Sequence, residues 1–248
     1  MRHYTAMWML FSGATLKKLL LCLLGTGLAE AGCFYHAMAP ELPLEAVFAQ
    51  SHIPLLSAVG FFLFCAVLTL HPFQKAVTTL RRSALTPRQC FCCHAIFNSL
   101  CGLIFWGAQL ALLLLLFRLY GAQAEEAVFG PQSILLAFYR NDYLHSLLPM
   151  ADGTRYLRNG LLLLGLGGAL ALPLARMGSR GSELTAAILT LLALRAFPVP
   201  MGSRGLDLAL SLIGAVVFLL ALYFQDEEEL RELSERRGGE REAEHEEG

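Results

Sequence analysis

The chain has 248 residues, of which 56% are hydrophobic and only 16% are charged, and its formal net charge is −1. A soluble domain carries about 25% charged residues, so this composition excludes an ordinary water-soluble fold and favours a membrane protein. Residues 225–248 hold 11 acids and 4 bases, a net charge of −7, which leaves +6 on residues 1–224. We therefore predict a transmembrane domain, residues 1–224, followed by an acidic tail, residues 225–248, that is cytoplasmic and disordered.

Six apolar stretches are candidates for membrane-spanning helices, because about 20 apolar residues of helix cross a hydrocarbon core of roughly 30 Å. They lie near residues 19–38, 54–72, 94–120, 160–175, 183–199 and 206–224. The fourth and fifth stretches are short and predict a hairpin that only just spans the bilayer. The predicted fold class is all-α, a polytopic membrane bundle of about six helices.

Two further segments are expected to lie along the membrane surface. Tyr4, Trp8 and Phe11 precede the first stretch, which favours a separate short helix with its aromatic rings at headgroup depth. Near residues 135–150, apolar side chains recur at helical spacing with charged residues between them. This pattern predicts an interfacial helix after the third span.

The distribution of Lys and Arg predicts the orientation, because these residues are retained on the cytoplasmic side of a membrane. With six spans, one face receives 13 basic residues and the other receives four. The first loop on the poorer face, residues 39–53, contains no Lys or Arg. We therefore expect both termini in the cytoplasm and the protein in the plasma membrane.

Glu30 and Arg195 are two ionisable residues that lie well inside predicted spans, the first and the fifth. Ionisable groups at such a depth are usually paired, buried against protein or functional. For Glu30 there are two explanations: the residue has a structural partner or lies at the membrane interface, or it has a role in a transport pathway. Arg195 lies close to Pro198 at a helix end, so its side chain can reach the interface without a function. An ion pair between Glu30 and Arg195 is the remaining alternative.

Four potential soft-metal ligands, Cys90, Cys92, Cys93 and His94, gather where a basic loop meets the third span. Zinc sites normally use ligand pairs of the form C-x₂₋₄-C and need a second pair elsewhere; Cys90, Cys92 and Cys93 match this form poorly, and the sequence has no second cluster. We interpret the segment as small, mainly apolar side chains at a helix start, with thiols that can still be reactive. We expect no metal, cofactor or disulfide framework.

The loop before this segment is the best functional lead in the sequence. Thr86 is expected to be the N-cap of the third span, with Pro87 at its first helical position. The alternative is an ordinary cytoplasmic loop, which is basic in any membrane protein.

The run from Thr79 to Arg88 resembles the basic turn between spans two and three of membrane subunits of type-two ATP-binding-cassette exporters. There, a segment of the form T-L-R-R-L-P-[IV]-[ST]-R precedes a long third helix, although proline follows Thr86 here instead of preceding it. The resemblance implies six spans, a dimer, and a coupling turn that docks on a separate ATPase subunit. The residues implied in that contact are Arg81, Arg82, Thr86, Pro87 and Arg88. The chain itself lacks the G-x-x-x-x-G-K-[ST] phosphate loop of an ATPase.

The leading hypothesis is therefore a transporter permease that works as a homodimer or heterodimer with a separate ATPase. The alternative is a membrane accessory or assembly protein whose acidic tail recruits a soluble partner. Glycines such as Gly165, Gly167 and Gly168 favour close helix packing around a pathway. No constellation for an intramembrane enzyme is present, and the dispersed basic residues argue against nucleic-acid binding.

Overall fold

The computed structural model describes residues 2–39, 41–70, 86–124, 129–130, 132–149, 153–175, 205–206, 208–219 and 222–223, with single positions at 184, 188 and 191. Every regular element in these parts is an α-helix, which confirms the predicted all-α class. The helices are α1 (Arg2–Ala37), α2 (Leu44–Gln50), α3 (Ile53–Leu70), α5 (Pro87–Gly121), α6 (Ser133–Arg140), α7 (Asp142–Leu147) and α8 (Gly153–Ala175). A shorter apolar helix covers Leu208–Leu219. Most of the predicted fifth span and the whole acidic tail lie outside the described residues.

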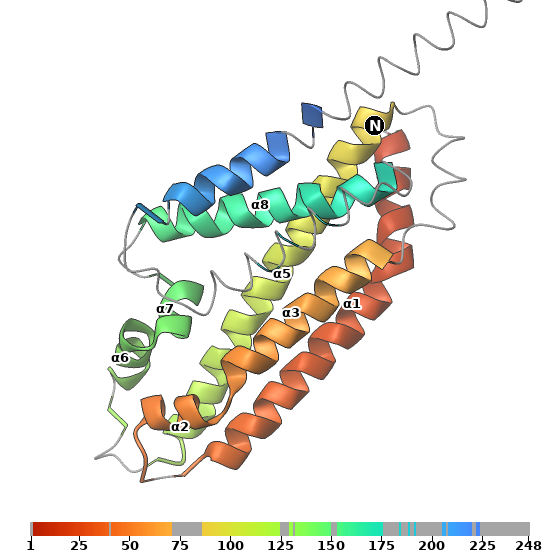
Figure 1. Cartoon of the computed structure of the whole chain (residues 1–248). Helices are drawn as coiled ribbons and strands as arrows, with labels where there is room; N and C mark the ends of the chain where they lie inside the picture. Colours follow the sequence, from red (N-terminus) through yellow and green to blue (C-terminus); the bar gives the residue numbers. More distant parts are fainter. Residues whose placement is uncertain are drawn as a thin grey trace, which may run out of the picture.

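Three long helices, α1, α3 and α5, run side by side and form the body of the molecule (Figure 1). α8 packs against α5 and more lightly against α3. The short helices α2, α6 and α7 gather at one end of this bundle, and the beginnings of α1 and α5 lie at the other (Figure 1). The fold therefore has a long helical body with a small helical cap at one end.

Two helical segments, Thr15–Ala37 and Arg88–Gly121, are long and apolar enough to cross a membrane. A third span is obtained if α2 and α3, which meet at an angle of 51°, are counted as one bent span. The described part of the chain thus contains two or three candidate spans, consistent with a membrane protein. The number six and the orientation stay predictions.

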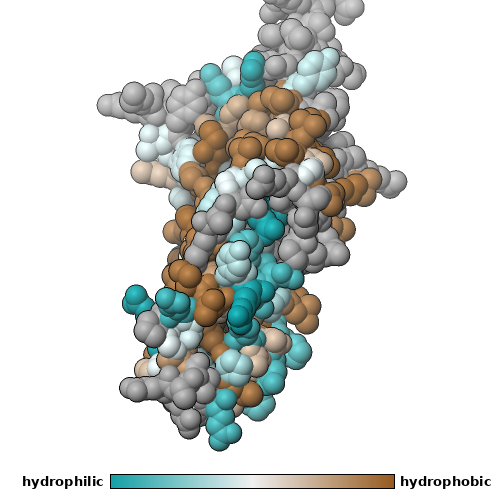
Figure 2. Space-filling model, turned by 90° about the vertical axis from the view of Figure 1, so that its left-hand side faces the viewer, coloured by the Kyte–Doolittle hydropathy of each residue, from teal (hydrophilic) through white to brown (hydrophobic). Residues whose placement is uncertain are grey.

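The surface of the body is suited to lipid. On α1, the large apolar side chains Leu16, Leu20, Leu24 and Leu28 are each more than half exposed. Soluble monomers rarely expose continuous apolar surface of this kind. Figure 2 shows hydrophobic residues in the upper part of one face and hydrophilic residues gathered lower down, at the level of the small helices. The hydropathy of the surface therefore changes along the bundle.

The predicted separate helix at the amino terminus is wrong, because α1 runs without interruption from Arg2 to Ala37. No proline interrupts this segment, and Phe11 is buried against Phe97 and His94 of α5. Phe11 therefore packs on α5 as part of the long helix α1, and not on a separate helix.

The segment near residues 135–150, predicted as one interfacial helix, forms two shorter helices, α6 and α7, and its position at the membrane surface stays a prediction. The chain breaks at Asn141, whose backbone is extended and whose side-chain oxygen accepts hydrogen bonds from the backbone N–H groups of Tyr143 and Leu144. Asn is one of the preferred N-cap residues, so it starts α7 in a new direction. Phe138 and Leu144 face the bundle and are fully buried, whereas Leu135, Leu136 and Tyr139 of α6 are exposed.

The predicted close packing at glycines is confirmed in α8. A Cβ placed on Gly165, Gly167 or Gly168 would lie within 3 Å of atoms of neighbouring helices. In α1, by contrast, Gly25 and Gly32 meet nothing within 4 Å. The close approach of α1 to α3 instead uses a glycine of α3, because a Cβ on Gly60 would lie within 3 Å of the side chain of Thr26 in α1.

Candidate functional site

The start of α5 has the predicted form. Thr86 is the N-cap and Pro87 occupies the first turn. The Thr86 hydroxyl accepts a hydrogen bond from the Gln89 backbone N–H, and the Gln89 side chain accepts one from the Thr86 N–H, both at 3.3 Å. This reciprocal capping box satisfies two backbone donors at the helix start. Arg88 is exposed there, whereas Arg81 and Arg82 lie outside the described residues.

Glu30 is completely buried inside a candidate span. One carboxylate oxygen, Oε1, accepts a hydrogen bond of 3.1 Å from the side-chain amide of Gln109 on α5. The other, Oε2, has no hydrogen-bond partner, and no basic side chain in the described parts forms an ion pair with it. Arg195 lies outside the described residues, so its pairing with Glu30 stays a prediction. The structure thus identifies Gln109 as a partner of Glu30.

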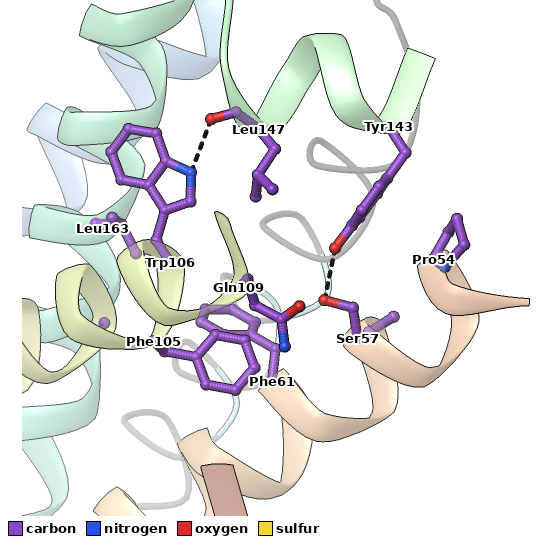
Figure 3. Close-up of a pocket in the computed structure, with 11 residues that line it drawn as sticks. Pro54, Ser57, Phe61, Phe105, Trp106, Gln109, Tyr143, Leu147 and Leu163 are labelled. Atoms are coloured by element: carbon purple, nitrogen blue, oxygen red, sulfur yellow. Dashed lines mark hydrogen bonds between the residues drawn. The ribbon is translucent and has the colours of Figure 1, made fainter. Parts of the chain in front are cut away.

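A partly enclosed cavity of about 40 Å³ lies next to this pair, between α3, α5, α7 and α8 (Figure 3). Gln109 is part of its wall, together with Ser57 of α3 and Tyr143 of α7. The Tyr143 hydroxyl donates a hydrogen bond of 2.7 Å to the Ser57 oxygen. Burial raises the pKa of the Tyr143 phenol, so this group remains a neutral donor. Polar groups from three helices therefore meet at one small space.

Aromatic rings make up much of the remaining wall. The indole N–H of Trp106 donates a hydrogen bond of 2.9 Å to the backbone oxygen of Leu147, which fastens α7 to α5 beside the cavity (Figure 3). Phe61 and Phe105 also form part of the wall, with ring centroids 5.4 Å apart. The ring centroids of Phe64 and Phe105 are 5.0 Å apart, so Phe64 extends this aromatic layer. The cavity is thus bordered by aromatic rings of α3 and α5 and by Tyr143 and Leu147 of α7.

α7 has a second anchor on α8. Asn159 donates a hydrogen bond of 2.9 Å to the backbone oxygen of Ser146. The fully buried guanidinium of Arg158 donates to the side-chain oxygen of Asn159 at 3.1 and 3.0 Å. These bonds fix the carboxyl-terminal end of α7 to the first turns of α8, next to the cavity.

A second buried polar group lies nearer the start of α5. His94 stacks on Phe11 with ring centroids 4.7 Å apart, and its Nδ1 has no hydrogen-bond partner. One turn further, Asn98 donates to the backbone oxygen of Gly167 at 3.4 Å. Cys93 is buried beside them, and nowhere in the described residues do three His, Cys, Asp or Glu side chains gather to hold a metal. This region packs α1 and α8 onto α5.

Sequence reasoning found Glu30 but missed Gln109, Ser57 and Trp106. It searched the spans for ionisable groups, and these three residues carry none. A signal was nevertheless present, since Gln109 is the only strongly polar residue within the run 103–117. The capping residues of α5 were found because they depend on local sequence alone.

Comparison with models of protein families, with curated proteins and with solved structures finds no match to this chain. Function is therefore argued from the site itself.

Proposed function

We propose that the chain is the membrane subunit of a transporter, a permease of the ATP-binding-cassette exporter kind driven by a separate ATPase subunit. In this proposal it lies in the plasma membrane with six spans, both termini in the cytoplasm, and works as a dimer. The chain moves the cargo, and the partner subunit hydrolyses ATP.

The observation that carries the proposal is the polar cavity beside Glu30 and Gln109, inside a bundle with a lipid-suited surface. A carboxylate at this depth is costly, and in membrane proteins such groups commonly mark a substrate or ion pathway. A membrane anchor or a scaffold has no need of such a group. The cavity, its aromatic walls and its attached helix α7 are consistent with a step on a pathway through the bundle.

The start of α5 supports the coupling part of the proposal. The capping box at Thr86 gives α5 a defined first turn, and exposed Arg88 lies directly on it. Acidic side chains of an ATPase subunit would pair with Arg88, and with Arg81 and Arg82 earlier in the sequence of the proposed coupling turn. The 35 residues of α5 then continue from this contact into the bundle.

The proposal is tested by purifying the detergent-solubilised protein from its own host and identifying the chains that accompany it. The wild type is compared with the triple variant Arg81→Glu/Arg82→Glu/Arg88→Glu. The matched control is Lys17→Glu/Lys18→Glu, two exposed residues of α1 on the same predicted face. We expect an ATPase subunit with a phosphate loop to accompany the wild type and the control but not the triple variant.

Reconstituted complexes provide the second measurement. ATP hydrolysis by the co-purified subunit should depend on the wild-type permease and fall with the triple variant. If no ATPase accompanies any sample and the acidic tail instead retains a soluble protein, the accessory-protein alternative replaces this proposal.

A further inference from the structure

The side chains that form the cavity have already used most of their hydrogen-bond donors. The amide nitrogen of Gln109 donates to Glu30, the indole nitrogen of Trp106 to Leu147, and the hydroxyl of Tyr143 to Ser57. The rotatable hydroxyl hydrogen of Ser57 and the second N–H of the Gln109 amide are the remaining side-chain donors of the wall.

Acceptors, by contrast, remain available. The amide oxygen of Gln109 has no hydrogen-bond partner although the side chain is only 4% exposed, and in Figure 3 it points toward Ser57. The carboxylate of Glu30 lies directly behind the Gln109 amide, with its second oxygen also without a partner. Buried acceptors beside a carboxyl group favour a ligand that donates hydrogen bonds, and a positive charge on that ligand would stabilise the ionised form of Glu30.

The residues that line the cavity favour an organic cation over a metal ion. Hard metal ions take about six or more oxygen ligands, whereas the side chains around this cavity offer three oxygens, from Ser57, Gln109 and Tyr143. The rings of Trp106, Tyr143, Phe61 and Phe105 instead provide the aromatic faces that attract ammonium groups. A cavity of about 40 Å³ has room for more than one water-sized group, which suits a primary ammonium and its first methylene.

We propose that this cavity binds the primary ammonium head of an amine, with Gln109 and Ser57 accepting its hydrogen bonds and Glu30 balancing its charge. The inference deepens the proposed function and rests on it, since it names the class of cargo: amines with an apolar remainder. The aromatic rings contact the methylene groups next to the nitrogen.

The test uses the full-length protein in lipid nanodiscs and the fluorescence of Trp106. The chain has two tryptophans, so the Trp8→Phe background leaves Trp106 as the sole emitter. Trp8 packs edge-on against Phe97, where phenylalanine preserves an aromatic contact. Three probes of equal chain length are titrated: n-octylammonium, n-octyltrimethylammonium and n-octanol, with sodium chloride titrated separately. The second probe has the charge without N–H donors, and the third has a donor without charge.

We expect a saturable change in Trp106 emission with octylammonium and a weak or unsaturable change with the other probes. In Glu30→Gln, which removes the charge but keeps a polar side chain, the Kd for octylammonium should rise about tenfold or more, because a nearby charge acts strongly in a weakly polar interior. The control Glu45→Gln removes a carboxylate that pairs with Arg140 at 3.4 Å outside the cavity, and should leave the Kd unchanged.

Equal binding of octanol, equal binding of the trimethylammonium probe, a saturable response to sodium alone, or an unchanged Kd in Glu30→Gln would each overturn the inference. If Glu30→Gln fails to fold, Ser57→Ala takes its place and should raise the Kd several-fold; an unchanged Kd there contradicts the inference equally. Binding is measured without ATPase. A failure to bind ammonium would thus not change the outcome of the ATPase co-purification experiment. The absence of an ATPase would likewise not change the outcome of the binding experiment.

Discussion

The contact between α8 and the helix Leu208–Leu219 depends on the absence of a side chain at Gly165, which leads to a sharp prediction for Gly165→Ala. A Cβ at this position would lie 2.5 Å from the carbonyl oxygen and 2.9 Å from the Cα of Gly214. Both are backbone atoms, so the two helices must separate by about 1 Å to restore ordinary contacts. Overpacking of this kind costs about 1–3 kcal/mol, while the higher helix propensity of alanine returns up to about 1 kcal/mol. Because both clashes are with backbone atoms, the upper end of the overpacking cost applies, and we expect a net loss of about 2 kcal/mol in the free energy of unfolding.

The matched control is Gly160→Ala on the same helix, where an added Cβ meets nothing within 4 Å. Only the propensity gain applies there, so this variant should be as stable as the wild type or more stable by up to about 1 kcal/mol. Both variants are unfolded from mixed micelles by titration with SDS and followed by far-UV circular dichroism. The reasoning is refuted if Gly165→Ala unfolds at the wild-type SDS fraction, or if Gly160→Ala is the less stable of the two.

Three further substitutions test individual hydrogen bonds of the fold. Thr86→Ala removes the cap of α5 and should lower the free energy of unfolding by about 1 kcal/mol, with faster amide exchange in the first turn of α5. Thr86→Ser keeps the hydroxyl and should have wild-type stability and exchange. If Thr86→Ser behaves like Thr86→Ala, the capping role is contradicted. Gln109→Leu leaves the buried Glu30 carboxylate without its donor and should cost about 2 kcal/mol in the same SDS titration, and a neutral result would show that Glu30 does not depend on this bond. Trp106→Phe leaves the Leu147 carbonyl without its donor and should cost about 1 kcal/mol. In Trp106→Phe, amide hydrogen exchange should become faster in α7 and stay unchanged in α2. An equal increase in both helices would contradict the role of Trp106 as a local anchor of α7.

The parts of the fold that follow from local sequence were predicted well. Apolar runs located α1, α3 and α5 because each helix satisfies its own backbone hydrogen bonds and needs only a long apolar segment. Thr86 followed by Pro87 predicted the start of α5 because a cap depends on neighbouring residues alone. The break at Asn141 was missed because the apolar spacing suits one helix or two, and the local capping role of Asn141 was not considered.

The candidate site was predicted only in part, for a related reason. A carboxylate in an apolar run is conspicuous, so Glu30 was found. Its partner Gln109 is 79 residues away in the chain, and the hydroxyls of Ser57 and Tyr143 are 86 residues apart. Such pairings arise from the way α1, α3, α5 and α7 pack together, which a single sequence does not specify.

α5 connects the two functional parts of the proposal. From Thr86 at its cap to Gln109 at the cavity, the helix rises about 35 Å, and proline occurs only in its first turn. An uninterrupted helix of this kind moves as a rigid element, because bending it requires a proline or a disrupted hydrogen bond. A displacement at Arg88 would therefore shift Gln109 and Trp106 against Ser57 of α3 and against α7. The hydrogen bonds from Trp106 to α7 and from Gln109 to Glu30 would be the first strained by that shift. The proposed ammonium site is thus placed where movement of α5 would change its affinity, as a transporter driven from the cytoplasmic end requires.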